Sequence, residues 1–163
     1  MSEFAVRKHP RLDYYDYSSP GAYFVTICTQ DRRRVLSRVG RGLAPAGIEL
    51  TEYGKIAEQQ LILLEQRYSF VKVDRYVIMP DHIHAIIVLG EKTAGASPRP
   101  TLMDIVSAYK SLTTRECKRI SCIKKLFQTS FYEHIIRDRD DYNACVRYIL
   151  ENPARWHSRS ENE

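Results

Sequence analysis

The 163 residues suffice for one compact domain, and 44% hydrophobic residues can form a substantial core. The 25 Lys and Arg exceed the 20 Asp and Glu, and the net charge of +5 is compatible with a polyanionic partner. No run is apolar enough to span a bilayer and the N-terminus lacks a signal core, so we expect a cytoplasmic protein. The four cysteines fit no Cys-x-x-Cys pattern, which favours free thiols in the core.

An arm over residues 1–21 precedes the first predicted strand. It interleaves basic residues with aromatic rings, including Arg11 and Tyr17. Such an arm can lie on a nucleic-acid backbone and stack its rings on unpaired bases. Alternatively, its tyrosines pack against the edge of a sheet, and the sequence leaves both interpretations open.

The next predicted elements are a strand, a loop and a helix. Residues 22–28 are rich in β-branched and aromatic residues, which are typical of strands. The strand exit carries three arginines that either grip phosphates or face solvent, namely Arg32, Arg33 and Arg34. After a glycine-rich loop over 37–49, Thr51 can cap a helix that runs to about Arg67.

Two further strands and a second helix are predicted in the centre of the chain. The apolar runs 68–79 and 82–89 are joined at Met79-Pro80-Asp81, where Pro-Asp favours a turn. A loop rich in small residues then leads to a helix that begins at Thr101 and carries one apolar stripe. Basic residues on or after this helix either contact phosphate or form a solvated face: Lys110, Lys124 and Lys125.

A final strand and helix complete the pattern. Residues 131–137 predict the strand, and acidic residues then complement the dipole at the start of the helix. We expect the helix to end near Asn152, because Pro153 disfavours a helical conformation in the residue before it. The order of elements predicts an α+β fold, a ferredoxin-like sandwich in which helices pack on one face of an antiparallel sheet. No second domain is indicated in residues 1–163.

Two histidines open the second of the central strands. Side chains at i and i+2 of a strand share a face, so His82 and His84 should project together while Ile83 points away. Two imidazoles on a stiff strand can form half of a divalent-metal site. A bare His-x-His pair is more often an edge pair without a ligand, so further ligands have to come from elsewhere.

The last helix can supply these ligands. Tyr148 and Asn152 are four residues apart and share a helix face, and the Asn152 carbonyl suits Mg²⁺ or Mn²⁺ as a third ligand beside the histidines. Tyr148 could then attack a phosphodiester and form a phosphotyrosine, because the metal withdraws charge from the phosphate. The structural alternatives are a packed tyrosine and an asparagine at the end of the helix.

Three stretches of the sequence, taken together, carry a resemblance to a known family. The first runs from Arg11 to Thr29, the second is Met79-Pro80-Asp81-His82-Ile83-His84, and the third joins residues 131–137 to 148–153. In this order and at these separations they resemble the REP-associated tyrosine transposases, a branch of the single-tyrosine HUH endonucleases. The resemblance extends over nearly the whole chain.

The resemblance implies an HUH fold and a nuclease dependent on Mg²⁺ or Mn²⁺ that cleaves and rejoins single-stranded DNA at palindromic repeat hairpins. It places the metal-binding pair at His82 and His84 and the nucleophile at Tyr148. Related transposases carry a Gln as third ligand where this chain has the shorter Asn152. Tyr132 is a rival nucleophile, but it lies on a predicted strand and lacks an amide four residues later.

Two other functions stay open at this point. A domesticated protein could bind repeat hairpins without productive transposition, although all the proposed catalytic residues are present. A ferredoxin-like domain unrelated to nucleic acid could carry the histidine pair by chance, and it would show no salt-dependent binding to single strands. The sequence does not decide between a monomer and a homodimer.

Overall fold

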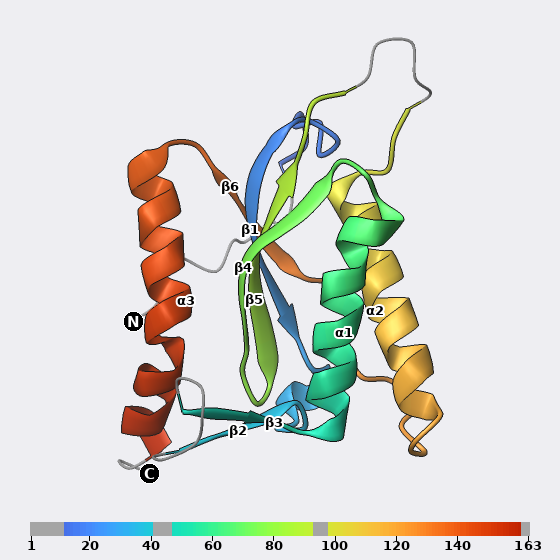
Figure 1. The fold of residues 1–163 in the computed structure, drawn as a ribbon, viewed down its shortest axis with the longest axis vertical. Coiled ribbons are helices and arrows are strands. Elements are labelled where there is room, and N and C mark those ends of the chain that lie inside the picture. Colours follow the sequence, from blue (N-terminus) through green and yellow to red (C-terminus); the bar gives the residue numbers. More distant parts are fainter. Residues whose placement is uncertain (1–11, 41–46, 93–97, 161–163) are drawn as a thin grey trace.

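The computed structural model describes residues 12–40, 47–92 and 98–160. Its elements follow the chain in the order β1 (Gly21–Cys28), η1 (Gln30–Arg32), β2 (Ser37–Val39), β3 (Ile48–Leu50), α1 (Glu52–Arg67), β4 (Val71–Ile78), β5 (His82–Leu89), α2 (Leu102–Lys118), β6 (Tyr132–Ile136) and α3 (Arg139–Ser160). Figure 1 shows a central sheet with α1 and α2 on one side and α3 on the other.

The four long strands form an antiparallel sheet in the order β4-β5-β1-β6, so β5 lies centrally. The predicted α+β class and the antiparallel sheet are thereby confirmed. The glycine-rich loop contains a separate two-stranded ladder of β2 and β3. The register of β4 shifts between Val73 and Arg75, and the residue between them, Asp74, accepts a hydrogen bond from the hydroxyl of Tyr142 on α3.

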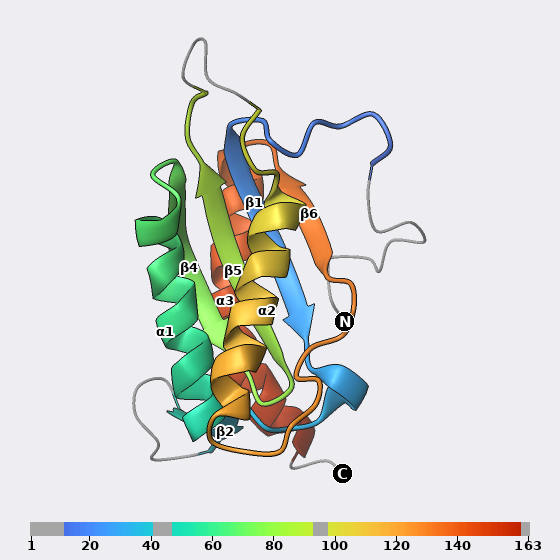
Figure 2. The ribbon, with the colours of Figure 1, turned by 90° about the vertical axis from the view of Figure 1, so that its right-hand side faces the viewer.

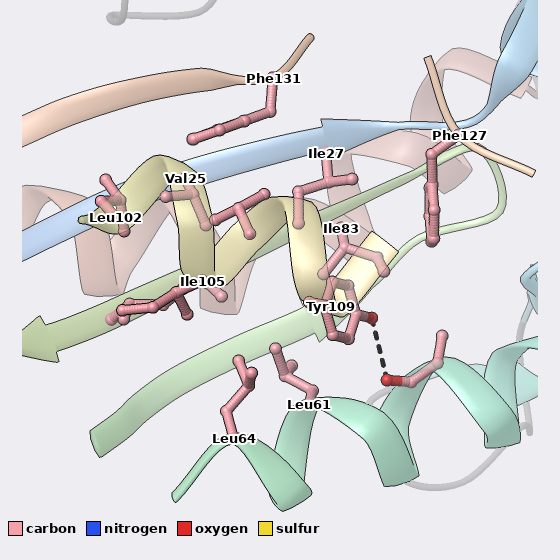
Figure 3. Close-up of a cluster of buried hydrophobic side chains, with 14 of the residues drawn as sticks. Val25, Ile27, Leu61, Leu64, Ile83, Leu102, Ile105, Tyr109, Phe127 and Phe131 are labelled. Carbon is pink, nitrogen blue, oxygen red and sulfur yellow. Dashed lines mark hydrogen bonds between the residues drawn. The ribbon is translucent and has the colours of Figure 1, made fainter. Parts of the chain in front are cut away.

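The larger core lies between the sheet and the pair α1 and α2, as Figures 2 and 3 show. Alternate residues of the central strands, such as Val25 and Ile83, point into it and meet Leu61 of α1. The hydroxyl of Tyr109 on α2 donates to the carbonyl of Ala57 on α1 at 2.9 Å. This buried polar group is therefore satisfied while the two helices are tied together.

A smaller core on the opposite face, which we call the α3 core, consists of Phe24, Val77, Met79, Ile86, Cys145 and Ile149. The expectation that the helices pack on one face is thus wrong for α3. The physical reason is that β1 and β5 are apolar on both faces, since Phe24 and Ile86 alternate with Val25 and Ala85. A sheet buried on both faces needs a cover on each side.

Helix α3 continues to Ser160 and passes through Pro153, so the predicted end near Asn152 is wrong. Proline removes one backbone hydrogen bond, which would have gone to the carbonyl of Ile149. Packing offsets this cost, because Trp156 in the following turn packs against the α3 core. Tertiary contacts therefore override a local helix-breaking preference.

No helix in the described ranges is long and apolar enough to cross a membrane. Three of the four free cysteines, Cys28, Cys117 and Cys145, are buried as expected, whereas Cys122 is exposed. Burial raises the pKa of the Cys117 thiol to about 11 and that of the Cys145 thiol to about 12. The thiols of these two residues therefore stay protonated at neutral pH.

Candidate active site

Two histidines at the start of β5 face α3. His82 is paired with Cys28 and His84 with Thr26 on β1. The centroids of the two imidazole rings are 4.6 Å apart, and the residues are only 8% and 4% exposed. Ile83 belongs to the larger core on the other face, so the predicted projection of both imidazoles from one face is confirmed.

The δ nitrogens of both rings have side-chain partners. Nδ1 of His82 lies 2.6 Å from Oδ1 of Asp81, and Nδ1 of His84 lies 2.9 Å from Oγ1 of Thr26. Nε2 of His84 is buried and has no hydrogen-bond partner within the described residues. Metal-binding histidines are oriented by such partners on their other nitrogen. Both rings can therefore offer Nε2 to a cation.

The charges and the burial around the histidine pair keep His84 neutral and Asp81 ionised. Burial lowers the pKa of His84 well below its ordinary value, and the charges of His82 and Arg32 lower it further. Burial alone would raise the pKa of Asp81, but its hydrogen bond with His82 and nearby arginine charges outweigh burial and lower it. An ionised carboxylate accepts the Nδ1 proton of His82, and a neutral imidazole is the form that binds a metal.

Helix α3 brings the predicted nucleophile and amide to the histidines. The ring of Tyr148 lies 5.1 Å from that of His84. Two turns further along the helix, the ring of Trp156 lies 6.2 Å from that of His82. Asn152 is buried one turn from each and shares their face of the helix. Its Nδ2 donates to the Tyr148 carbonyl at 3.1 Å, which leaves Oδ1 for another partner.

The stripe that packs α3 on the sheet is wider than the sequence indicated. We expected Tyr148 to lie on a different face from Cys145 and Ile149, but its ring also packs on the α3 core, with its centroid 5.9 Å from that of Phe24. Residues three and four apart share a helix face, so the phenol belongs to the sheet-facing side. Tyr148 is therefore both a packed tyrosine and a residue beside the histidine pair.

The three consecutive arginines have different neighbours. Arg32 forms an ion pair of 3.1 Å with Asp81, and the guanidinium of Arg34 lies 5.1 Å from the ring centre of Trp156. These two cations border the histidine site. Arg33 points elsewhere, since its Nη2 donates at 2.8 Å to a backbone carbonyl in the segment before β6.

Sequence reasoning missed two residues of α3 beside the site, Trp156 and Arg155. The guanidinium of Arg155 lies 5.4 Å from the ring centre of Tyr148 and donates to Glu151 at 2.8 Å. Both residues were hidden by the expected end of the helix near Asn152. Their spacing from Tyr148, two helical turns, was the signal that could have found them.

The predicted lysines lie beside α2, on the other face of the sheet from the histidine pair. Lys110 donates to the carbonyl of Thr129 at 2.8 Å, and Lys125 donates to the hydroxyl of the same residue at 2.7 Å. Lys124 is exposed in the same segment. The structure therefore gathers these cations beside α2, and their contact with DNA stays a prediction.

Tyr15 and Tyr17 of the arm pack on the sheet edge, which is the second of the two alternatives, whereas Tyr14 is exposed. Tyr17 is 7% exposed and donates its hydroxyl to Glu133 of β6 at 2.8 Å. Its ring lies 4.9 Å from that of Tyr15. This burial contradicts a base-stacking role for Tyr17, and Arg11 lies outside the described residues.

Comparisons with known proteins find relatives of this chain. No protein-family model matches the chain. An uncharacterized protein of Haemophilus influenzae is 30% identical, over 92% of this chain and 89% of its own. The REP-associated tyrosine transposase of Escherichia coli K12 is 27% identical, over 85% of this chain and 70% of its own. The chain is thus a homologue of named REP-associated tyrosine transposases.

The fold of the chain is also that of a solved REP-associated tyrosine transposase. That structure, determined with a bound REP hairpin, matches with a TM-score of 0.63 and 24% identity. The match covers 95% of this chain and 74% of the other. At this identity the likeness supports the fold alone, and the homology rests on the sequence relatives.

Tyr132, the predicted rival of Tyr148 as nucleophile, lies in the same row of the sheet as His84. Both residues are paired with Thr26 of β1, one from each side. Two strand spacings of about 4.8 Å each therefore separate Tyr132 from His84. The ring of Tyr148, at 5.1 Å, is closer to the imidazole, which favours Tyr148 as the nucleophile.

A second group of metal-ligating side chains lies at the start of α3. His134, Asp141 and Cys145 bring their ligand atoms within 4.8 Å of one another. Nε2 of His134 lies 2.7 and 2.9 Å from the two carboxylate oxygens of Asp141, so these groups satisfy each other. With a pKa of about 12, the Cys145 thiol keeps its proton, whereas a metal binds the thiolate. The histidine pair of β5 is therefore the better metal site.

Proposed function

We propose that the chain is a single-stranded DNA endonuclease and strand transferase that depends on Mg²⁺ or Mn²⁺ and forms a 5′-phosphotyrosine intermediate. The observation that supports it most is the contact of Tyr148 with His84, a buried imidazole whose Nε2 has no hydrogen-bond partner within the described residues. Two elements far apart in the sequence, β5 and α3, meet at this point (Figure 1).

The donor set fits a hard divalent cation. Nε2 of His82, Nε2 of His84 and Oδ1 of Asn152 would hold it, and imidazole with amide oxygen suits Mn²⁺ or Mg²⁺. When bound, the cation supplies positive charge that polarises the phosphodiester. Asp81 and Thr26 hold the imidazoles through their Nδ1 atoms, so the pair is oriented before a ligand arrives.

Replacing Thr26 by valine should weaken Mn²⁺ binding by about 10- to 100-fold, the usual effect of losing an outer partner of a metal-binding histidine. Valine keeps the shape of the side chain but removes the hydroxyl that lies 2.9 Å from Nδ1 of His84. Calorimetric titration with Mn²⁺ measures the effect, and thermal unfolding checks that the variant is folded. An unchanged affinity would show that Thr26 does not orient the ligand.

The chain's own residues account for the chemistry at Tyr148. Its phenolic oxygen forms a bond to phosphorus while the bond from phosphorus to the 3′ oxygen breaks. The phenol loses its proton and the departing oxygen gains one, which leaves a free 3′ hydroxyl. A phenol normally ionises near pH 10, about three units above neutrality. The guanidinium of Arg155 lies 5.4 Å from the centre of the Tyr148 ring.

The proposed substrate is a palindromic repeat hairpin with a single-stranded flank. Its support is the solved family member whose structure contains a REP hairpin. Arg32 and Arg34 border the site and are placed to contact phosphates on the way to Tyr148. The covalent intermediate conserves the energy of the phosphodiester, so a 3′ hydroxyl can attack it and rejoin the strands.

We also propose that one copy of the chain is catalytically complete. The two imidazoles, the amide and the phenol all come from β5 and α3 of the same chain. A homodimer is then compatible with activity but contributes no proposed ligand or nucleophile.

The test of the proposal is a covalent adduct between the protein and a hairpin oligonucleotide. With Mn²⁺ present, the adduct should appear on a denaturing gel, and peptide mass spectrometry should find the DNA on Tyr148. With a chelator in place of the metal, the adduct should be absent. Noncovalent binding without any adduct would instead indicate a domesticated hairpin-binding protein.

A further inference from the structure

A groove of about 480 Å³ lies between α2 and the segment that leads into β6. Four of its ten lining residues are cationic: Lys110, Arg115, Lys118 and Lys125. The lining residues in the described part of the chain include no Asp or Glu. Ser107 and Ser111 add hydroxyl groups, so the groove combines positive charge with hydrogen-bond donors, the pattern that contacts phosphate.

The two walls of the groove are tied together. Lys110 on α2 donates to the carbonyl of Thr129 on the other wall at 2.8 Å. Lys125 donates to the Thr129 hydroxyl at 2.7 Å. Beside them, Phe127 is buried and forms a β-bridge with Thr29. The groove is therefore held in shape by its own cations.

The groove is close to the histidine site although α2 and α3 lie on opposite faces of the sheet (Figure 2). The amide of Gln128, a lining residue, donates to the carbonyl of Cys28 at 2.9 Å. Cys28 is in turn paired with His82. These three residues form one row, so two strand spacings, about 10 Å, separate the groove wall from the histidine strand.

The shape of the groove favours an extended polyanion over a single phosphate. Its residues on α2 run from Ser107 to Lys118, which at 1.5 Å per residue is about 16 Å. A strand of B-form DNA rises about 3.4 Å per phosphate along its axis and also winds around it, so several but fewer than five consecutive phosphates fit this length. Cations spaced along a helix match such a row of charges.

We propose that this groove is a second DNA site, which binds the phosphodiester backbone on the far side of the sheet from Tyr148. The identity of the polyanion rests on the proposed function. Because the groove offers cations and hydroxyl groups, it holds and positions the DNA without reading its sequence. The backbone it holds belongs either to the hairpin stem or to the single-stranded flank.

The test compares the wild type with a double variant that carries both Arg115→Ala and Lys118→Ala. DNA binding is measured by fluorescence anisotropy at several salt concentrations. The probes are a hairpin with a single-stranded flank and an unpaired strand of equal length. We expect about tenfold weaker binding and a salt slope lower by about 1 to 2, the effect of losing two phosphate contacts. The control double variant, Lys55→Ala with Lys72→Ala, removes two exposed charges from α1 and β4 and should bind like the wild type.

The two probes distinguish the sources of the backbone. A loss confined to the hairpin probe assigns the groove to the stem, and an equal loss on both probes assigns it to the single strand. Wild-type affinity and salt slope on both probes would overturn the second site. Formation of the Tyr148 adduct is measured separately, so the proposed function can stand or fall without the groove.

Discussion

Replacing Tyr148 by phenylalanine should abolish cleavage of a hairpin oligonucleotide, with a loss of at least about 10³-fold, because no other group supplies the attacking oxygen. Binding should change less than about twofold, since the ring that packs against Phe24 and His84 is retained. Gel assays of cleavage and anisotropy measurements of binding separate the two effects. The variant isolates the hydroxyl from the packing role of the residue.

Tyr132→Phe is the matched control, because Tyr132 is 41% exposed and lies across β1 from His84. This variant should cleave at close to the wild-type rate. Full cleavage by the Tyr148 variant together with loss of cleavage by the Tyr132 variant would move the nucleophile to β6. Cleavage by both would require a different reaction altogether.

Replacing His84 by alanine should weaken Mn²⁺ binding by more than about 100-fold, beyond the effect expected for an outer partner. His84 offers the buried Nε2 that has no hydrogen-bond partner within the described residues, so its removal deletes a ligand from the proposed set. Cleavage should fall to the level seen with a chelator. Titration calorimetry measures the affinity, and thermal unfolding tests whether the cavity left by the ring disrupts the fold.

His134→Ala is the control that distinguishes the two groups of metal-ligating side chains. His134 is bound to Asp141 at the start of α3 and takes no part in the proposed site. The variant should bind Mn²⁺ as the wild type does. Loss of binding in this variant, with normal binding after His84→Ala, would place the cation at the group formed with Asp141 and Cys145.

Local patterns in the sequence were enough to predict the four long strands and the histidine pair. Alternation along residues 82–89 correctly placed His82 and His84 on one face, because a strand has a period of two. The spacing of Tyr148 and Asn152 correctly placed both on one face of a helix. That these two elements meet depends on the order of strands and the side chosen by α3, which local patterns do not contain.

Failures arose where distant contacts overrode a local preference. Pro153 suggested the end of a helix, yet the contact of Trp156 with the α3 core carries the helix on to Ser160. The tyrosines of the arm suggested base stacking, but Glu133 on a strand far along the chain accepts the hydroxyl of Tyr17. In both cases the contact involves residues of other elements, which the sequence around Pro153 or Tyr17 does not identify.

The position of α3 has a consequence for how the activity of the proposed site can change. The imidazoles lie on the sheet and the phenol lies on α3. The sheet and α3 pack together through the α3 core, which includes Cys145 and Ile149. In the proposed mechanism, a change of side-chain volume in that patch would shift α3 and alter the distance between the phenol and the imidazoles. Turnover can thus be adjusted by residues that never meet a nucleotide, while the imidazole pair stays intact on its strand.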